Sequence, residues 1–162
     1  MKMLESANNK PLADILVIDD TPENLALLSQ ILKDKGYKVR SVTKASTGLR
    51  GAKAAPPDLI LLDIKMPEMS GYEVCQHLKT DDLTRDIPVI FISALGDVLD
   101  KVKAFEVGGV DYITKPVQVE EVLARIQTHL TIRRLQQQLQ TKNIQLQQEI
   151  SERTAAEEKF AK

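Results

Sequence analysis

The sequence predicts an α/β protein built on a doubly wound, five-stranded parallel sheet, with an extended C-terminal helix. Three runs, at residues 15–18, 59–62 and 89–92, are apolar at every position, which is typical of strands buried on both faces of a parallel sheet. Segments with the apolar spacing of helices separate these runs, and strands that alternate with helices favour parallel sheets. After Pro116, neither Gly nor Pro occurs up to Lys162, so one helix can span the last third of the chain.

The first elements follow from residues that begin and end helices. Residues 1–12 are mainly polar and are expected to form a flexible tail before the first strand. The first helix is expected to begin at Pro22, with Thr21 as a plausible cap, and to end at Gly36.

Two further strands and four further helices complete the expected order. The strand signals at 38–42 and 110–114 are weaker than those of the three apolar runs. The helices are expected at 45–54, from Ser70 onward with Glu73 at capping-box spacing, at 97–107 before Gly108 and Gly109, and after Pro116.

The last helix carries two apolar faces. The first can pack on the sheet and consists of Val122, Leu123, Ile126 and Leu130. The second has the seven-residue repeat of a coiled-coil seam and consists of Ile132, Leu139, Asn143, Leu146 and Ile150. We therefore expect a domain at 13–130 and a coiled-coil linker helix at 131–162, which would form a homodimer in which Asn143 fixes the register. A single solvated helix is the alternative.

Composition excludes several classes of protein. The net charge is −1 and the C-terminal helix carries acidic residues among its basic ones, so no direct binding to nucleic acid is expected. No apolar run approaches the roughly 20 residues of a membrane span. The single cysteine, Cys75, cannot form an intramolecular disulfide, which favours a reducing compartment and predicts a cytoplasmic location.

The candidate site lies where the strands end. Asp19 and Asp20 follow the first strand, Asp63 the central one, Ser93 the next, and Lys115 the last. These side chains are expected to meet, because the carboxyl ends of parallel strands lie at one edge of the sheet. Clustered carboxylates repel one another unless a cation lies among them, and oxygen ligands favour Mg²⁺. Asp63 is the natural nucleophile for an aspartyl-phosphate, which Ser93 and Lys115 could contact.

Four segments, ILVIDDTPEN, PDLILLDIKMPEMSGYEV, IPVIFISA and GVDYITKP, occur in this order. Over residues 13–130 the chain resembles the receiver domain of two-component response regulators. The resemblance implies a flavodoxin-like fold and a phosphorylation-dependent switch whose Asp63 accepts a phosphoryl group from a histidine kinase or phosphotransfer protein. It implies these further roles: Mg²⁺ held by Asp19, Asp20, Asp63 and the backbone carbonyl of Lys65, phosphoryl contacts from Ser93 and Lys115, a rotating Tyr112, and a cis Pro116.

The resemblance implies a switch that catalyses only its own phosphoryl transfer and slow dephosphorylation. A phosphohydrolase of the haloacid dehalogenase type would carry a second Asp two residues after the nucleophile, where this sequence has Lys65. The alternative is a phosphate-independent, receiver-like dimerisation or interaction module. The tail also looks like the signalling linkers that join receivers to a following domain, so an output domain is expected beyond Lys162.

Overall fold

The structure is a computed structural model that describes residues 10–94 and 100–160. Five parallel strands form one sheet in the order β2-β1-β3-β4-β5. The strands are β1 (Asp14–Ile18), β2 (Lys38–Val42), β3 (Leu59–Asp63), β4 (Val89–Ser93) and β5 (Asp111–Thr114). The helices are α2 (Pro22–Lys35), α3 (Ala45–Ala54), α4 (Gly71–Thr80), α5 (Lys101–Glu106) and α6 (Val119–Phe160).

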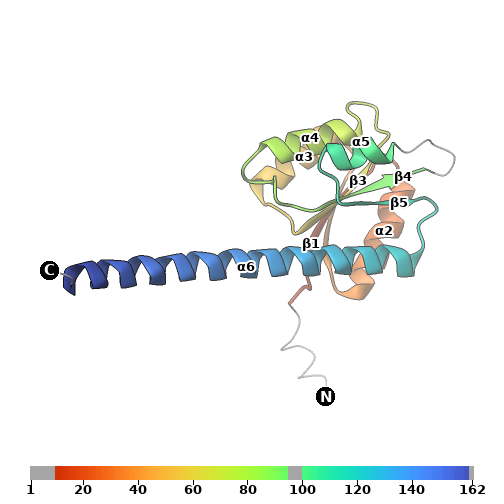
Figure 1. The fold of residues 1–162 in the computed structure, drawn as a ribbon. Coiled ribbons are helices and arrows are strands. Elements are labelled where there is room, and N and C mark those ends of the chain that lie inside the picture. Colours follow the sequence, from red (N-terminus) through yellow and green to blue (C-terminus); the bar gives the residue numbers. More distant parts are fainter. Residues whose placement is uncertain (1–9, 95–99, 161–162) are drawn as a thin grey trace, which may run out of the picture.

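Helices cover both faces of the sheet, as predicted (Figure 1). α2 and α6 lie on one face, and α3, α4 and α5 lie on the other. Successive residues of a strand point to opposite faces. Ile15 and Val17 therefore join the core beneath α2 and α6, whereas Leu16 and Ile18 join the core beneath α3 and α4. This two-sided burial explains why the β1, β3 and β4 segments contain hardly any polar residue before their carboxyl ends.

Most element boundaries agree with the sequence prediction, and the exceptions have local causes. β5 begins at Asp111, one residue later than expected. In the described part of the 97–107 segment, α5 begins at Lys101, where the side chain of Asp100 accepts a hydrogen bond from the Lys103 N–H. The expected helix start at Asp97 lies outside the described residues, as do residues 1–9 of the expected tail.

The cap predictions had different outcomes. Gly36 ends α2 with φ of +105°, a left-handed conformation that glycine adopts without strain. Ser70 caps α4, because its Oγ accepts a hydrogen bond from the Glu73 N–H at 3.3 Å. The expected side-chain cap at Thr21 is wrong. Thr21 precedes α2, but its side chain accepts no hydrogen bond from a helix N–H, and its hydroxyl lies 3.5 Å from Asp20 Oδ1.

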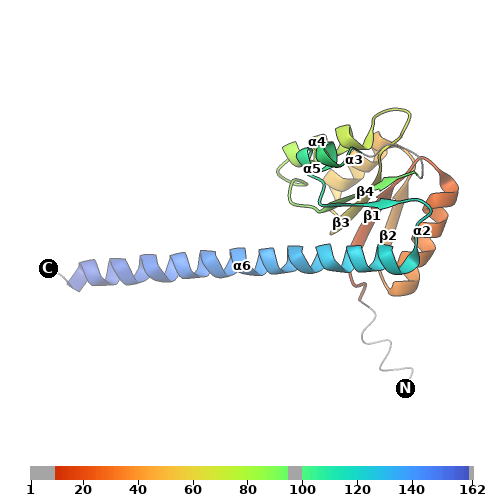
Figure 2. The same ribbon diagram turned by 45° about the vertical axis from the view of Figure 1, so that its right-hand side comes forward.

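The long helix is one continuous element of 42 residues, about 63 Å at 1.5 Å per residue. Val122 and Ile126 are fully buried, and Leu123 and Leu130 pack against the same core, as predicted. Beyond this contact α6 runs past the sheet and away from the domain (Figure 2). No helix in the described ranges is both long and apolar enough to cross a lipid bilayer.

Candidate functional site

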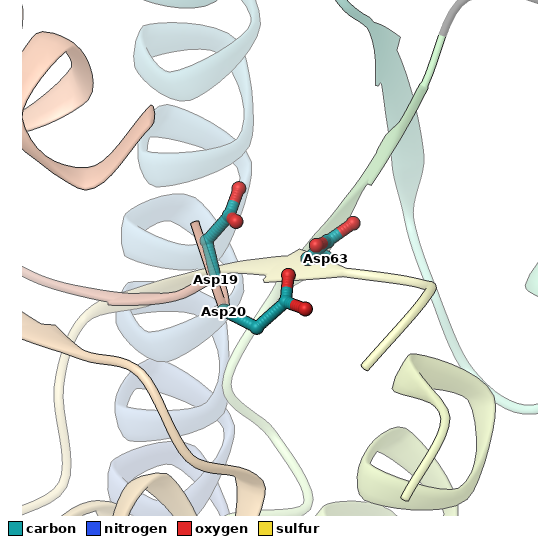
Figure 3. Close-up of side chains that lie close together, drawn as sticks. All are labelled: Asp19, Asp20 and Asp63. Atoms are coloured by element: carbon teal, nitrogen blue, oxygen red, sulfur yellow. The ribbon is translucent and has the colours of Figure 1, made fainter. Parts of the chain in front are cut away.

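Three carboxylates converge at the carboxyl end of the sheet, as the sequence predicted (Figure 3). Asp19 and Asp20 follow β1 directly, and Asp63 is the last residue of the neighbouring strand β3. One oxygen from each side chain lies within 4.8 Å of the others. Asp19 is fully buried and Asp63 is 4% exposed, so water screens their mutual repulsion poorly.

Lys115 brings one positive charge to this cluster. Its Nζ lies 3.1 Å from Asp19 Oδ2 and 3.6 Å from Asp63 Oδ2. Lys115 is held in place by its own backbone, since its N–H donates to the Ser93 carbonyl at 2.7 Å. One ammonium among three carboxylates leaves a net negative charge at the site, so the cluster attracts further cations.

Burial and the clustering of carboxylates raise the pKa of Asp63. Burial, followed by the charge of Asp19, raises its pKa from 3.8 to about 7, and the Lys115 ammonium only partly opposes the increase. Contact with the Asp20 carboxyl raises the pKa further. A bound cation would favour the ionised form of Asp63, which is the form that can act as a nucleophile.

The described residues fit a hard divalent cation. Asp19 Oδ2 is buried and accepts no well-oriented hydrogen bond within the described part of the chain, although Lys115 Nζ lies nearby. The other oxygen of Asp19 accepts the Thr21 N–H at 2.9 Å, which orients the carboxylate. A donor set made of oxygens alone suits Mg²⁺ rather than zinc or copper. The acidic cluster is therefore compatible with magnesium.

The remaining expected site residues surround the cluster. Ser93 ends β4, is 4% exposed, and its Oγ lies 3.4 Å from the Ala94 carbonyl. Tyr112 is partly buried on the adjacent β5, with the Lys101 ammonium 5.2 Å from its ring centre. The Lys115–Pro116 peptide bond is cis, as expected. Lys65 lies two residues beyond Asp63, and the role of its carbonyl stays a prediction.

Gly71 holds the loop after Asp63 against the strand. Its N–H donates to the Ile64 carbonyl at 2.7 Å. A Cβ at this position would lie 2.3 Å from the Asp63 carbonyl oxygen and 2.8 Å from the Ile64 Cα. Only a residue without a side chain permits this approach, so Gly71 helps to define where the Asp63 backbone lies.

Sequence analysis did not identify a second polar cluster, on the β5 edge of the domain. Nη1 of Arg125 lies 2.9 Å from both carboxylate oxygens of Asp111, and His129 Nε2 lies 2.9 Å from Asp111 Oδ2. Asp111 also accepts the N–H of Tyr112 at 2.8 Å. Arg125 and His129 are four residues apart and thus share a helix face, which was the available signal.

Comparison with known proteins identifies the family. A family model of the response regulator receiver domain matches residues 15–127. The DNA-binding dual master transcriptional regulator RpaA of Synechocystis is 44% identical over 116 residues, which cover 72% of this chain and 48% of that protein. Response regulator PleD of Caulobacter vibrioides is 40% identical over 116 residues, which cover 72% of this chain and 26% of that protein. The chain therefore belongs to the response regulator receiver domain family.

Solved structures show the same fold. A putative response regulator from Chloroflexus aurantiacus matches with a TM-score of 0.71 and 30% identity, covering 75% of this chain and 99% of that one. A response regulator receiver domain protein from Methanospirillum hungatei matches with a TM-score of 0.72 and 29% identity, covering 77% of this chain and 98% of that one. The flavodoxin-like fold is thus confirmed. This chain spans about half the length of RpaA and about a quarter of the length of PleD.

Proposed function

We propose that this chain is a phosphorylation-dependent switch of a two-component phosphorelay, with Asp63 as the phosphoacceptor. The observation that carries the proposal is the position of Asp63. It ends the central buried strand, within 4.8 Å of the other two carboxylates, and Lys115 Nζ lies 3.6 Å from its Oδ2. A carboxylate in such a cluster can form an acyl phosphate.

The phosphodonor would be a phosphohistidine on a histidine kinase or phosphotransfer protein. An oxygen of Asp63 attacks the phosphorus, the P–N bond breaks as the P–O bond forms, and the released imidazole takes a proton from solvent. Lys115 is placed to contact a phosphoryl oxygen. Ser93, at the end of the adjacent strand, can donate its hydroxyl to another oxygen.

Asp19, Asp20 and Asp63 would hold Mg²⁺, together with the Lys65 carbonyl. When bound, Mg²⁺ would neutralise negative charge on the carboxylates and on the incoming phosphoryl group. Thr21 keeps Asp19 oriented through its backbone N–H.

The signal would leave the site through Ser93 and Tyr112. When Ser93 moves toward the new phosphoryl group, Tyr112 rotates inward and β5 shifts with it. The partly buried position of Tyr112 beside β4 supports this role. The phosphoryl group moves the equilibrium only by the difference between its interactions in the two states, which is typically a few kcal/mol.

We propose that the receiver unit covers residues 13–130 and that residues 131–162 form the coiled-coil linker of a homodimer. The apolar seam side chains are well exposed in the single chain, between 44% for Ile132 and 64% for Ile150. Asn143 at a seam position favours two parallel strands in register. An output domain after the linker is in keeping with the greater length of the relatives.

The receiver fold fits a non-enzymatic switch, and some relatives carry enzyme names, such as a probable cyclic di-GMP phosphodiesterase of Vibrio cholerae that is 39% identical over 140 residues. We propose that this part of the chain catalyses only its own phosphoryl transfer and dephosphorylation. A cytoplasmic location, in contact with a kinase and not with nucleic acid, stays a prediction from the sequence.

Intact mass spectrometry after incubation with acetyl phosphate and Mg²⁺ tests the proposal. We expect one added phosphoryl group that disappears without Mg²⁺ and in Asp63→Asn, while the control Asp82→Asn, at an exposed carboxylate outside the cluster, retains it. Absence of uptake by the unmodified protein would favour the phosphate-independent interaction module.

A further inference from the structure

Arg125 and His129 belong to the same helical stripe as the coiled-coil seam. Arg125 lies seven residues before Ile132, and His129 lies fourteen residues before Asn143. If the seven-residue repeat of the seam is extended toward the N-terminus of α6, Arg125 and His129 occupy seam positions, which in a coiled coil face the partner helix. Here the Asp111 carboxylate contacts both of them from β5 of the same chain.

These contacts are directional and join α6 to β5, whereas Val122 and Ile126 make apolar contacts with the sheet. α6 also donates a hydrogen bond from Arg133 to the Asp86 carbonyl, in the loop before β4. Val122 and Ile126 are buried among aliphatic side chains, and this packing attracts the helix to the sheet without the directional preference of a hydrogen bond. Side-chain head groups lie about 5–6 Å from a helix axis, so a rotation of about 20° would move them by about 2 Å. That displacement breaks hydrogen bonds of 2.9 Å, such as those of Arg125 and His129 to Asp111.

Asp111 is the first residue of β5, the strand of the expected switch residue Tyr112. Its Oδ1 accepts the Tyr112 N–H at 2.8 Å, and Tyr112 pairs with Phe91 on β4, two residues before Ser93. One carboxylate therefore contacts both β5 and α6. On the far side of Arg125, Glu121 accepts from its Nε at 3.2 Å and helps to hold the guanidinium in place.

We propose that Asp111 is a positioning residue that sets the rotation and tilt of α6 against the sheet and passes a shift of β5 on to the coiled-coil seam. The first half of this inference is independent of phosphorylation, and the second half rests on the proposed function. Because about 35 residues of α6 follow Arg125, a tilt of about 5° there displaces the far end by roughly 5 Å. Movements of β5 that are small at Asp111 thus become large at the output end.

The test measures the direction of α6 with two spin labels in one chain. In a Cys75→Ala background, labels are attached at Ser46→Cys on α3 and at Gln148→Cys on α6, both exposed positions. Labelled chains are diluted in excess unlabelled protein, so that only distances within one chain contribute. The distance distribution is recorded before and after addition of acetyl phosphate and Mg²⁺.

We expect a narrow distribution that shifts on phosphorylation. Asp111→Asn should broaden the distribution at least twofold without the phosphodonor and lose at least half of the shift. Arg125→Lys keeps a cation at this position. It should therefore retain a narrower distribution and a larger shift on phosphorylation than Arg125→Gln. The matched control is Asp14→Asn, because Asp14 forms an Asp–Arg pair of similar exposure with Arg40 near the opposite edge of the sheet. This control should behave like the background protein.

The inference is overturned if Asp111→Asn retains the width and shift of the background protein, or if Asp14→Asn changes them equally. Circular dichroism checks that each variant is folded. If Asp111→Asn does not fold, Arg125→Gln tests the contact between Asp111 and α6 from the other side. Intact mass measures phosphate uptake separately. If the background protein takes up no phosphate, the proposed function fails, whereas the distribution without phosphodonor still decides whether Asp111 orients α6.

Discussion

Lys115 Nζ lies 3.1 Å from Asp19 Oδ2, so the residue that follows the last strand places its ammonium beside the carboxylate that follows the first strand. This single ammonium cannot balance the neighbouring carboxylates as well. The uncompensated charge, which the pKa of Asp63 reflects, is stored as a local destabilisation of the folded protein. The same charge cluster that lowers the stability of the folded protein thus enables the site to bind a cation and a phosphoryl group.

Asp63→Asn should stabilise the protein in the absence of divalent cations. The amide removes one of the clustered charges, and because each pKa unit is worth about 1.4 kcal/mol, a gain of a few kcal/mol is expected at neutral pH. Urea denaturation in EDTA measures it. Mg²⁺ should raise the free energy of unfolding of the unmodified protein and so reduce its difference in stability from Asp63→Asn. Asp82→Asn, at an exposed carboxylate, should change the free energy of unfolding by less than about 0.5 kcal/mol.

The raised pKa of Asp63 predicts that the free energy of unfolding depends on pH. The pKa of Asp63 is about 7 in the folded protein and 3.8 ordinarily, so between these values the folded state binds more protons than the unfolded state. The Asp63 contribution to stability is therefore greatest below about pH 4 and is lost as the pH rises through about 7. Denaturation curves in EDTA for the unmodified protein should lose stability over this window relative to Asp63→Asn. An equal slope in both proteins would contradict the assignment.

Asp111 should show the opposite dependence. Burial by itself would raise its pKa, but hydrogen bonds from His129, the Tyr112 N–H and Arg125 together lower it below the ordinary 3.8. Its contribution is therefore present above about pH 4 and is lost as the pH falls through the depressed value. At pH 7 Asp111→Asn should cost about 2 kcal/mol, typical of hydrogen bonds to a charged group. The difference between the two proteins should shrink steadily on acidification below pH 4.

Gly71→Ala should disturb the acceptor strand. The new Cβ would lie 2.3 Å from the Asp63 carbonyl, so the backbone must move, at a cost of about 2 kcal/mol or more. Phosphate uptake should slow at least tenfold. Gly51→Ala is the matched control, because a Cβ added there would have no atom within 4 Å. Alanine favours the helical conformation more than glycine does, so this substitution in α3 should raise the free energy of unfolding by about 0.5–1 kcal/mol. Unchanged stability and uptake in Gly71→Ala would show that the loop relaxes freely.

The seam can be tested on two residues of similar exposure. Leu146 lies on the predicted seam and is 44% exposed, whereas Ile144 lies off the seam and is 50% exposed. Leu146→Gln should weaken dimerisation at least tenfold, since burying a leucine contributes about 1.5–3 kcal/mol. Ile144→Gln should leave the dissociation constant within about twofold. Sedimentation equilibrium measures both, and equal effects would reject the proposed register.

Much of the fold could be predicted because the signals are local. Runs such as 59–62 and 89–92 are short, rich in branched residues and apolar throughout, which is typical of strands buried on both faces. Gly36 and Ser70 mark helix ends through their own conformation and hydroxyl. The prediction failed at Thr21, whose hydroxyl lies 3.5 Å from Asp20 Oδ1 and accepts no N–H of the helix. Cap preferences describe an isolated helix end and do not include a neighbouring carboxylate, such as that of Asp20, that attracts the hydroxyl.

By itself, the sequence determined the order of strands and helices, the residues at each strand end, and the length of the C-terminal helix, because each depends on neighbouring residues. Only the tertiary structure decided the distances between segments far apart in the chain. It brought Lys115 to Asp19, seated Gly71 on the Asp63 backbone, and placed Asp111 between β5 and α6. Such contacts depend on how whole elements pack, and the sequence around either partner carries little information about packing geometry.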